Sequence, residues 1–143
     1  MKLWQKNFEI NSEIERFTVG RDREMDLYLA QDDVLGSMAH ITMLESIGLL
    51  EKEELKQLLA ELRRIYAVIQ EGGFRIEDGI EDVHSQVELM LTRALGDMGK
   101  KIHSGRSRND QVLVDLKLFT RHELMEAADG VKVLFDELIQ KSE

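Results

Sequence analysis

Apolar residues recur at helical spacing along most of this chain. The clearest case follows Glu51, where apolar positions recur at i, i+3, i+4 and i+7 and Gly72 and Gly73 close the run. The first turn of this segment is acidic, which complements the positive end of a helix dipole. The pattern predicts an amphipathic helix over residues 51–71, with its apolar face formed by Leu55, Leu58, Leu59, Leu62, Ile65, Tyr66 and Ile69.

Two weaker patterns flank this helix. From Asp22, a candidate N-cap, apolar residues continue at roughly helical spacing to Leu44, and Gly48 is a plausible stop. After a predicted loop at residues 74–79, a second pattern runs over residues 81–95 and is expected to end at Gly96 and Gly99. Residues 1–20 are mixed and predict a short capped helical turn or an irregular arm.

The longest apolar stripe occupies the last part of the chain, and it predicts a helix from Asn109 or Asp110 towards the end. About 29 residues would form a rod roughly 40 Å long, at about 1.5 Å per residue. The preceding short helices cannot cover such a face, so we expect its partners in an oligomer or elsewhere in a longer protein. The stripe comprises Leu113, Leu116, Thr120, Leu124, Ala127, Val131, Leu134 and Leu138.

These patterns predict an all-α protein in two parts. Residues 1–105 would form a domain of short helices, and residues 106–143 would form a loop and a long helix. No proline interrupts any of the patterns.

Composition narrows the classes of protein. The chain has 143 residues, of which 43% are hydrophobic and 33% charged, as expected of a globular domain. Its net charge of -9 argues against nucleic acid as a partner, and the absence of cysteine excludes disulfides and thiolate chemistry. No apolar stretch approaches a membrane span and the first residues lack the core of a signal peptide, so a cytoplasmic protein is expected.

Positive charge is nevertheless concentrated in residues 100–111, which contain two lysines and two arginines. Ser107, Arg108 and Asn109 would present a hydroxyl, a guanidinium and an amide at the start of the last helix, where free N–H groups favour an anion. Arg106 and Arg108 could each bind a carboxylate in bidentate fashion. From the spacing alone, a basic loop followed by an ordinary Asn109–Asp110 cap is equally plausible. A nucleic-acid or phosphosite patch is disfavoured by the net charge and the lack of interleaved aromatic residues.

His84 is the other candidate for chemistry, with Asp82 or Glu88 tuning it in a proton-transfer or ligand-orienting role. The alternative interpretation of a single helical histidine is a partly buried packing residue. A metal site is not expected, because no second histidine lies three or four residues away. We expect His40 and His122 to be structural or exposed. The acidic series Asp22, Asp26, Asp32 and Asp33 is expected to be mostly a solvated face.

Several segments together resemble one family. Residues 103–111, His-Ser-Gly-Arg-Ser-Arg-Asn-Asp-Gln, closely resemble the H-[ST]-G-R-S-R-N-D-Q signature of the argininosuccinate lyase family. This family belongs to the aspartase/fumarase superfamily, which also includes delta-crystallin. Residues 81–85 resemble its E-D-[IV]-H-[ST] segment and residues 36–40 its G-S-x-A-H stretch, while residues 3–4 and 115–118 fit its start and its D-L-[KR]-L continuation. The resemblance covers essentially the whole chain in collinear order, and it favours a binding site over a plain basic loop.

The resemblance implies cleavage of argininosuccinate to arginine and fumarate by anti β-elimination, without a cofactor or a metal. It implies that Asp26 faces the amino-acid end of the substrate and that His84 lines the site. The substrate-binding residues would then be Ser107, Arg108, Asn109, His84 and Asp26. Weaker assignments are Asp82, behind His84, together with Arg106, His103, Ser104 and Asp22, the last standing where the family often has a serine.

The resemblance also implies what lies outside this sequence. The family's proposed acid and its catalytic serine would both fall beyond residue 143, so none of the proton-transfer residues would be in this chain. The family's site is built from three subunits of a homotetramer whose core is a bundle of long helices. The chain would be the amino-terminal domain and the first long helix of that bundle, inactive alone. The alternative is a non-catalytic structural or oligomerisation module derived from the same family.

Overall fold

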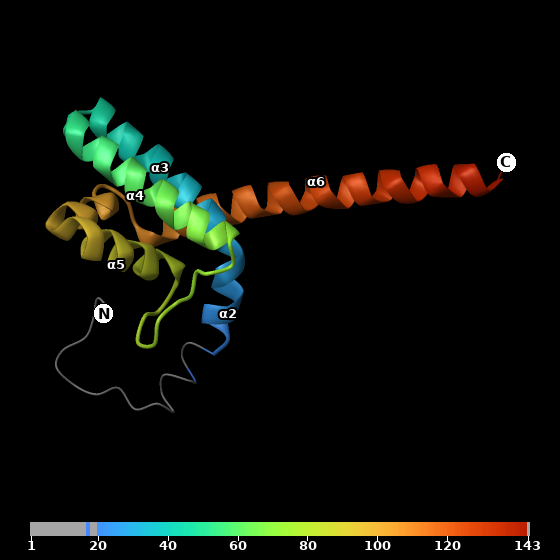
Figure 1. The fold of residues 1–143 in the computed structure, drawn as a ribbon, viewed down its shortest axis with the longest axis horizontal. Helices are drawn as coiled ribbons and strands as arrows, with labels where there is room; N and C mark the ends of the chain where they lie inside the picture. The colour runs from blue at the N-terminus through green and yellow to red at the C-terminus, as the bar shows by residue number, and fades with distance from the viewer. Residues whose placement is uncertain (1–16, 18–19, 143) are drawn as a thin grey trace.

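The protein was analysed as a computed structural model that describes residue 17 and residues 20–142 (Figure 1). The described part is helical and contains no β-strand, which confirms the all-α prediction. The expected arm over residues 1–20 lies outside the described residues apart from Phe17 and Gly20. The elements in chain order are α2 (Asp22–Asp26), the 3-10 helix η1 (Leu27–Leu29), α3 (Ala30–Ser46), α4 (Lys52–Gln70), α5 (Val83–Leu95), the 3-10 helix η2 (Gly96–His103) and α6 (Arg108–Ser142).

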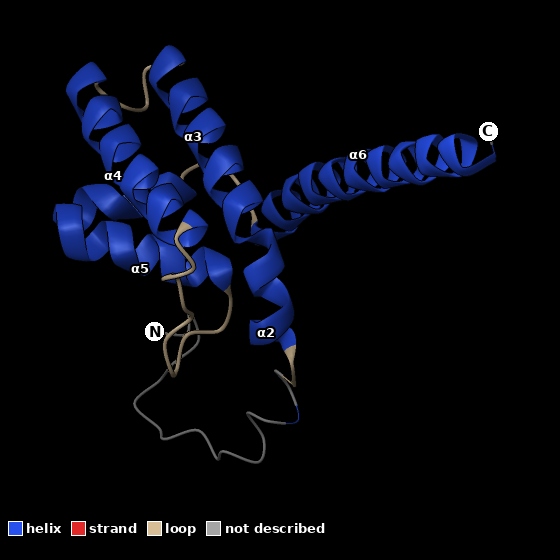
Figure 2. Cartoon of the chain, turned by 45° about the vertical axis from the view of Figure 1, so that its right-hand side comes forward, coloured by secondary structure: helices blue, strands red, loops and turns tan. Residues whose placement is uncertain are grey.

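The apolar core lies where α3, α4 and α5 meet. Helices α3 and α4 lie side by side, and α5 crosses near the lower half of α4 (Figure 2). The predicted stripe of α4 supplies Leu58, Leu62 and Ile65, all fully buried. The other helices add buried aliphatic side chains that pack against it, namely Val34, Ile41, Leu44, Val83, Val87, Leu91 and Ile102.

Local side-chain contacts fix the helix boundaries. Helix α4 begins where the backbone N–H of Glu51 donates to Glu54 Oε2 at 3.0 Å, and Glu54 in turn pairs with Lys101 of η2. Helix α5 begins at the N-cap Asp82, whose carboxylate accepts from the backbone N–H of Ser85 at 2.8 Å. The predicted stop of α3 is confirmed, since Gly48 follows Ser46 with a φ of 79°.

Two expected boundaries were wrong. Asp22 is the first helical residue rather than the N-cap, a position held by Arg21, and a 3-10 turn separates this short helix from α3. Residues 100–103 form the end of η2 rather than a loop. Although Gly96 ends α5 with a φ of 63°, the chain turns back along α5 because Gly99 lies against its backbone and Ile102 is buried.

Helix α6 begins at Arg108, one residue earlier than predicted, and runs for 35 residues. At about 1.5 Å per residue it is roughly 50 Å long. Its first turns pack on α3, and every residue from Thr120 to Ser142 is exposed (Figure 1). The exposed fraction of Leu134 is 60% and that of Leu138 is 59%. The prediction that nothing earlier in the chain covers this stripe is therefore confirmed for the described residues.

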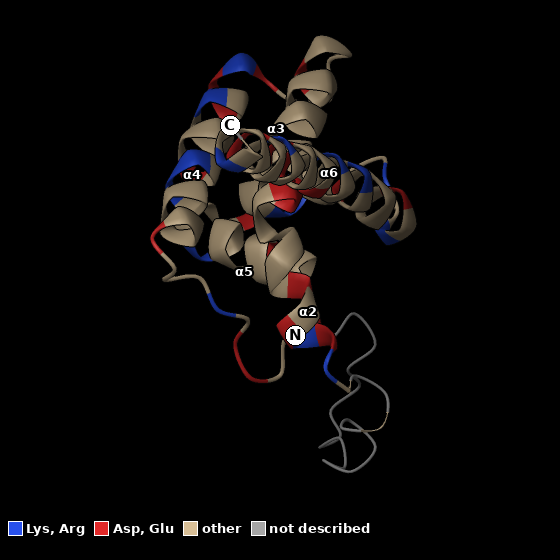
Figure 3. Cartoon of the chain, turned by 90° about the vertical axis from the view of Figure 1, so that its right-hand side faces the viewer, with Lys and Arg blue, Asp and Glu red and all other residues tan. Residues whose placement is uncertain are grey.

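The surface charges are mixed. Lysines and arginines are spread over several elements with acidic residues among them (Figure 3). None of the helices described here is both long and apolar enough to cross a membrane.

Candidate functional site

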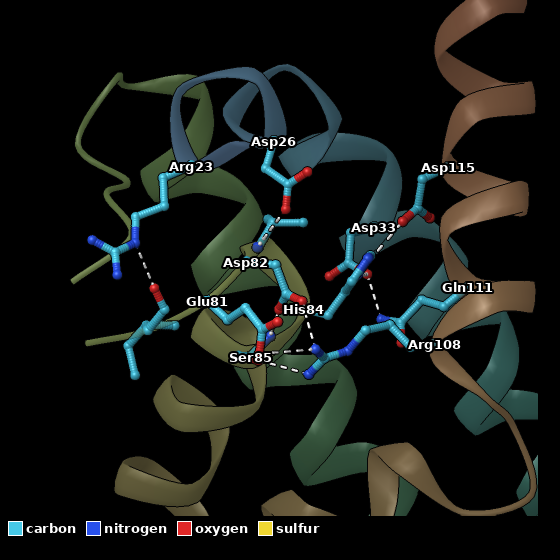
Figure 4. A network of polar contacts seen from close by, with 12 residues as sticks. Arg23, Asp26, Asp33, Glu81, Asp82, His84, Ser85, Arg108, Gln111 and Asp115 are labelled. Carbon is cyan, nitrogen blue, oxygen red and sulfur yellow. Dashed lines mark hydrogen bonds and ion pairs between the residues drawn. The ribbon is translucent and has the colours of Figure 1, made fainter. Parts of the chain in front are cut away.

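A cluster of polar side chains lies where α2, α3, α5 and the start of α6 converge (Figure 4). It joins residues far apart in sequence, such as Asp33 and Gln111, which are 78 positions apart. Three of the residues predicted to bind substrate, Asp26, His84 and Arg108, belong to this cluster.

Arg108 projects from the first turn of α6 to the start of α5. Its Nη1 lies 2.9 Å from Asp82 Oδ2 and 3.5 Å from Glu81 Oε2, and its Nη2 donates to the Ser85 hydroxyl at 3.0 Å. Asp82 therefore caps α5 and holds the guanidinium at the same time. A substrate carboxylate bound by Arg108 would share it with these acidic residues.

Asp26 brings a second carboxylate to the start of α5. One of its oxygens accepts from the backbone N–H of Val83 at 3.1 Å. Burial raises the pKa of Asp26, and this outweighs the opposing effects of the Val83 hydrogen bond and the charge of His84. The N-terminus of α5 thus holds two acidic side chains, Asp26 and Asp82, as its dipole favours.

His84 is buried and bound to an acid from another helix. Its Nδ1 lies 2.7 Å from Asp33 Oδ1, which also accepts from Gln111 Nε2 at 2.5 Å. Asp115 Oδ2 of α6 lies 3.7 Å from the same Nδ1. The partner of His84 is therefore Asp33, rather than Asp82 or Glu88 as the sequence suggested.

The acidic series on α3 is not a solvated face, contrary to expectation. Asp32 and Asp33 are 2% and 0% exposed, because this side of α3 packs against α6. His122 Nδ1 of α6 lies 3.4 Å from Asp32 Oδ1. Only Asp22 of the series is exposed, and Asp26 is half-buried.

The protonation of this cluster reflects its burial. Burial disfavours the imidazolium, yet the hydrogen bond and charge of Asp33 prevail and raise the pKa of His84. Burial, with the adjacent Asp33 charge, raises the pKa of Asp115 to about 7, although His84 and Arg106 oppose it. The cluster therefore contains a carboxyl group that changes charge near neutral pH.

The loop before α6 is tied to α3. Arg106 Nη2 donates to the Ser37 hydroxyl at 3.0 Å, and His40 Nε2 lies 2.8 Å from the Ser104 carbonyl oxygen. On the same helix, Gly36 permits a close approach of α6 itself, since a Cβ there would lie 3.3 Å from Val114 Cγ1. Arg106 and Arg108 thus contact different helices, α3 and the start of α5.

The carboxylate of Asp110 caps the start of helix α6. Its Oδ1 accepts from the backbone N–H and the hydroxyl of Ser107, at 2.6 and 2.7 Å. Asn109 is exposed and forms no side-chain hydrogen bond within the described part of the chain, so it is not part of the cap. Its amide is free to meet a ligand.

Residues 8–143 match a family model described as "Lyase". The chain belongs to this lyase family. The match covers nearly all of the sequence, including every element described above, and it confirms that the chain is a lyase-family protein.

Proteins from several bacteria are similar to this chain in sequence. It is 74% identical over 142 residues to the argininosuccinate lyase of Bacteroides thetaiotaomicron, and 76% identical over 141 residues to that of Phocaeicola vulgatus. Both alignments cover 99% of this chain and 32% of the relative. The argininosuccinate lyase of Thermotoga neapolitana is 42% identical over 130 residues, covering 91% of the chain and 33% of the relative. The resemblance inferred from the motifs is confirmed, and the chain spans about a third of the length of these relatives.

The remaining predicted site residues of this lyase-family chain make no side-chain hydrogen bond to the cluster within the described part of the chain. Asp22 is exposed, and its charge helps to raise the pKa of Asp26. Nearby, Arg21 pairs with Glu24, and Arg23 donates to the carbonyl of Ile80. His103 is half-buried and Ser104 and Ser107 are exposed in the loop before α6.

Several members of the cluster were not predicted as site residues, namely Asp33, Gln111 and Asp115 together with Glu81 and Ser85, which contact Arg108. Gln111 and Asp115 are four residues apart at the start of α6 and are 5% and 1% exposed. Two polar residues at i and i+4 on one helix face could have indicated a buried polar contact.

The ligand atoms of Asp33, His84 and Asp115 lie within 4.8 Å of one another, a spacing that a metal ion could use. Asp33 Oδ1, however, already accepts from both His84 and Gln111. The positive charge of Arg106 also acts on this cluster. We therefore assign the cluster as a network of hydrogen bonds, through Asp33, and of charge interactions, through Asp115.

Stability should depend on pH through Asp115. Its pKa in the folded protein, about 7, exceeds the ordinary value of 3.8, so the folded state holds an extra proton between these values. The free energy of unfolding should therefore fall as pH rises from about 4 to 7. The other groups facing Asp115 are Asp33, His84, Arg106 and Asp32.

Asp115→Asn removes this titration. Urea unfolding at pH 5 and pH 8 should show the variant gaining stability relative to wild type at the higher pH. An unchanged difference between the two proteins at both pH values would show that Asp115 ionises normally.

Proposed function

We propose that this chain is part of an argininosuccinate lyase, which cleaves argininosuccinate to arginine and fumarate by β-elimination in arginine biosynthesis. The observation that carries the proposal is the 74% and 76% identity, over 99% of the chain, to relatives named argininosuccinate lyase. Because those relatives are about three times as long, the activity is assigned to the whole protein.

The chemistry of the reaction suits the start of α6. Removal of a proton next to a carboxylate places additional negative charge on that carboxylate, and fixed donors and cations stabilise it. The first turn of α6 offers free backbone N–H groups, the Arg108 guanidinium and the exposed Asn109 amide. The reaction needs no cofactor.

Each residue predicted to bind substrate has a role in this proposal. Ser107, Arg108 and Asn109 bind a substrate carboxylate, and His84 lines the site. Asp26 faces the amino-acid end of the substrate, whose ammonium group it can meet. Asp82 orients Arg108, as its 2.9 Å contact with Nη1 supports. The acid and the base come from segments outside this chain.

We further propose that the whole protein is a cytoplasmic homotetramer that binds a small-molecule substrate and no nucleic acid. The exposed apolar stripe of α6, including Leu124, Val131 and Leu134, supports assembly through this helix. In this arrangement residues 1–105 form one domain and residues 106–143 begin the central bundle. The intermixed surface charges support the exclusion of nucleic acid (Figure 3).

Product analysis tests the proposal. The full-length protein, incubated with argininosuccinate, is expected to release arginine and fumarate in equal amounts, measured by chromatography and by the ultraviolet absorbance of fumarate. A succinylated purine nucleotide serves as the comparison substrate and should yield no fumarate. Fumarate from the nucleotide but not from argininosuccinate would assign the site to a different substrate.

A further inference from the structure

We infer that Asp33 and Asp115 are positioning residues for His84, holding its Nδ1 between α3 and α6 and leaving Nε2 as the nitrogen that meets the substrate. The part of this inference that concerns the substrate rests on the proposed function. The orientation of the His84 ring is independent of that function and can be measured separately.

The geometry places both carboxylates at one ring nitrogen. Asp33 Oδ1 lies 2.7 Å and Asp115 Oδ2 lies 3.7 Å from His84 Nδ1 (Figure 4). The side chains are 5% exposed for His84, 0% for Asp33 and 1% for Asp115, so water competes little for these contacts. Three helices converge on this nitrogen, because Asp33 is on α3, His84 on α5 and Asp115 on α6.

Hydrogen-bond chemistry then determines the form of the ring. An ionised carboxylate only accepts, so a 2.7 Å contact with Asp33 requires a proton on Nδ1. In the neutral ring Nε2 is then an acceptor, and in the cation it is a donor. In both forms the contact of Nδ1 with Asp33 fixes the direction in which Nε2 points.

Gln111 links this orientation to the substrate-binding turn. Its Nε2 donates to the same oxygen of Asp33 at 2.5 Å, which fixes the Asp33 carboxylate. Gln111 follows Arg108 by three residues on α6, and so lies on the same side of the helix. This contact therefore fixes the position of the turn that carries Arg108 and Asn109 relative to His84.

The buried carboxylates of Asp33 and Asp115 are compensated by nearby positive charge. Several buried oxygens have no hydrogen-bond partner among the described residues, namely Asp33 Oδ2 and both carboxylate oxygens of Asp115. A cavity of about 80 Å³ lies beside Asp115, lined also by Arg106, Gln111 and His40, and has room for water. His84 and Arg106 supply the positive charge that such a pair of buried acids requires. Asp32 and Asp82 act on the cluster from α3 and α5.

The test uses the full-length protein labelled with ¹⁵N in its histidines, with the His84 signals identified by their loss in His84→Gln. Wild type should show Nδ1 protonated. Asp33→Asn should lower the midpoint of the ring titration by about one pH unit and mix the two neutral tautomers. It should also lower kcat by roughly tenfold or more with a smaller change in KM. Asp115→Asn should lower the midpoint by less.

Asp129→Asn, an exposed acid on α6, is the matched control and should change neither signal nor kcat. Unchanged His84 signals in both Asp33→Asn and Asp115→Asn would overturn the inference, as would a shifted signal with unchanged kcat. If Asp33→Asn fails to fold, the titration midpoint and the kcat of Asp115→Asn decide the inference. Both Asp115 carboxylate oxygens lack a hydrogen-bond partner among the described residues, so this substitution removes no hydrogen bond from the fold. A wild-type protein that releases no fumarate would reject the proposed function, while the ring signals would still decide the positioning.

Discussion

Replacing Gly99 by alanine is expected to lower the free energy of unfolding by roughly 2–4 kcal/mol. A Cβ at this position would lie 2.5 Å from the Leu91 carbonyl carbon, 2.6 Å from the Thr92 nitrogen and 2.7 Å from the Leu91 oxygen. All three atoms belong to the backbone of α5 and cannot rotate away as a side chain could. The substitution must therefore separate η2 from α5.

Gly73→Ala is the matched control. Gly73 follows α4, and a Cβ there would make only ordinary contacts, 3.5 Å from Val68 Cγ1 and 3.5 Å from the Val68 carbonyl oxygen. Its φ is not in the left-handed region, so this variant should unfold at or slightly above the wild-type midpoint. Urea unfolding of the full-length proteins compares the two. Equal midpoints for Gly99→Ala and wild type would contradict the close packing of η2 on α5.

The strongly periodic parts of the fold were predictable from the sequence. In α4 the apolar face, the acidic first turn and the closing glycines agree, and the observed helix Lys52–Gln70 matches the predicted span within one residue. The long stripe of α6 likewise predicted both the helix and the lack of cover from the preceding helices. In such segments local propensity and burial favour the same structure.

The short segments were less predictable because tertiary contacts determine them. The 3-10 helix η2 depends on the approach of Gly99 to α5, which no local pattern of residues 96–103 indicates. The short helix at Asp22 breaks at Leu27 although the apolar spacing continues. Helical periodicity alone cannot distinguish one long helix from two joined by a tighter turn.

The sequence located some residues of the polar cluster but not the contacts between them. The motif segments located Arg108, His84 and Asp82, and the structure brings them together at the start of α5. The burial of Asp33 could not be foreseen, because it depends on how α3, α5 and α6 meet. An acidic run on one helix predicts a solvated face until another helix covers it.

Replacing Asn109 by alanine should greatly reduce lyase activity with little change in stability. Asn109 is the second residue of α6, is exposed and forms no side-chain hydrogen bond among the described residues. Such surface substitutions change the free energy of unfolding by about 0.5 kcal/mol or less. Loss of one donor to a developing negative charge costs roughly 100- to 1,000-fold in kcat.

The most direct test of the proposed site is therefore the rate of fumarate release from argininosuccinate by full-length wild type and Asn109→Ala. Gln140→Ala, an exposed position near the far end of α6, is the control and should retain wild-type rates. Asn109→Ala is expected to unfold at the wild-type urea midpoint and to lose at least roughly 100-fold in kcat. Wild-type turnover by Asn109→Ala at both saturating and limiting substrate would contradict the assignment of the α6 start as the substrate-binding turn.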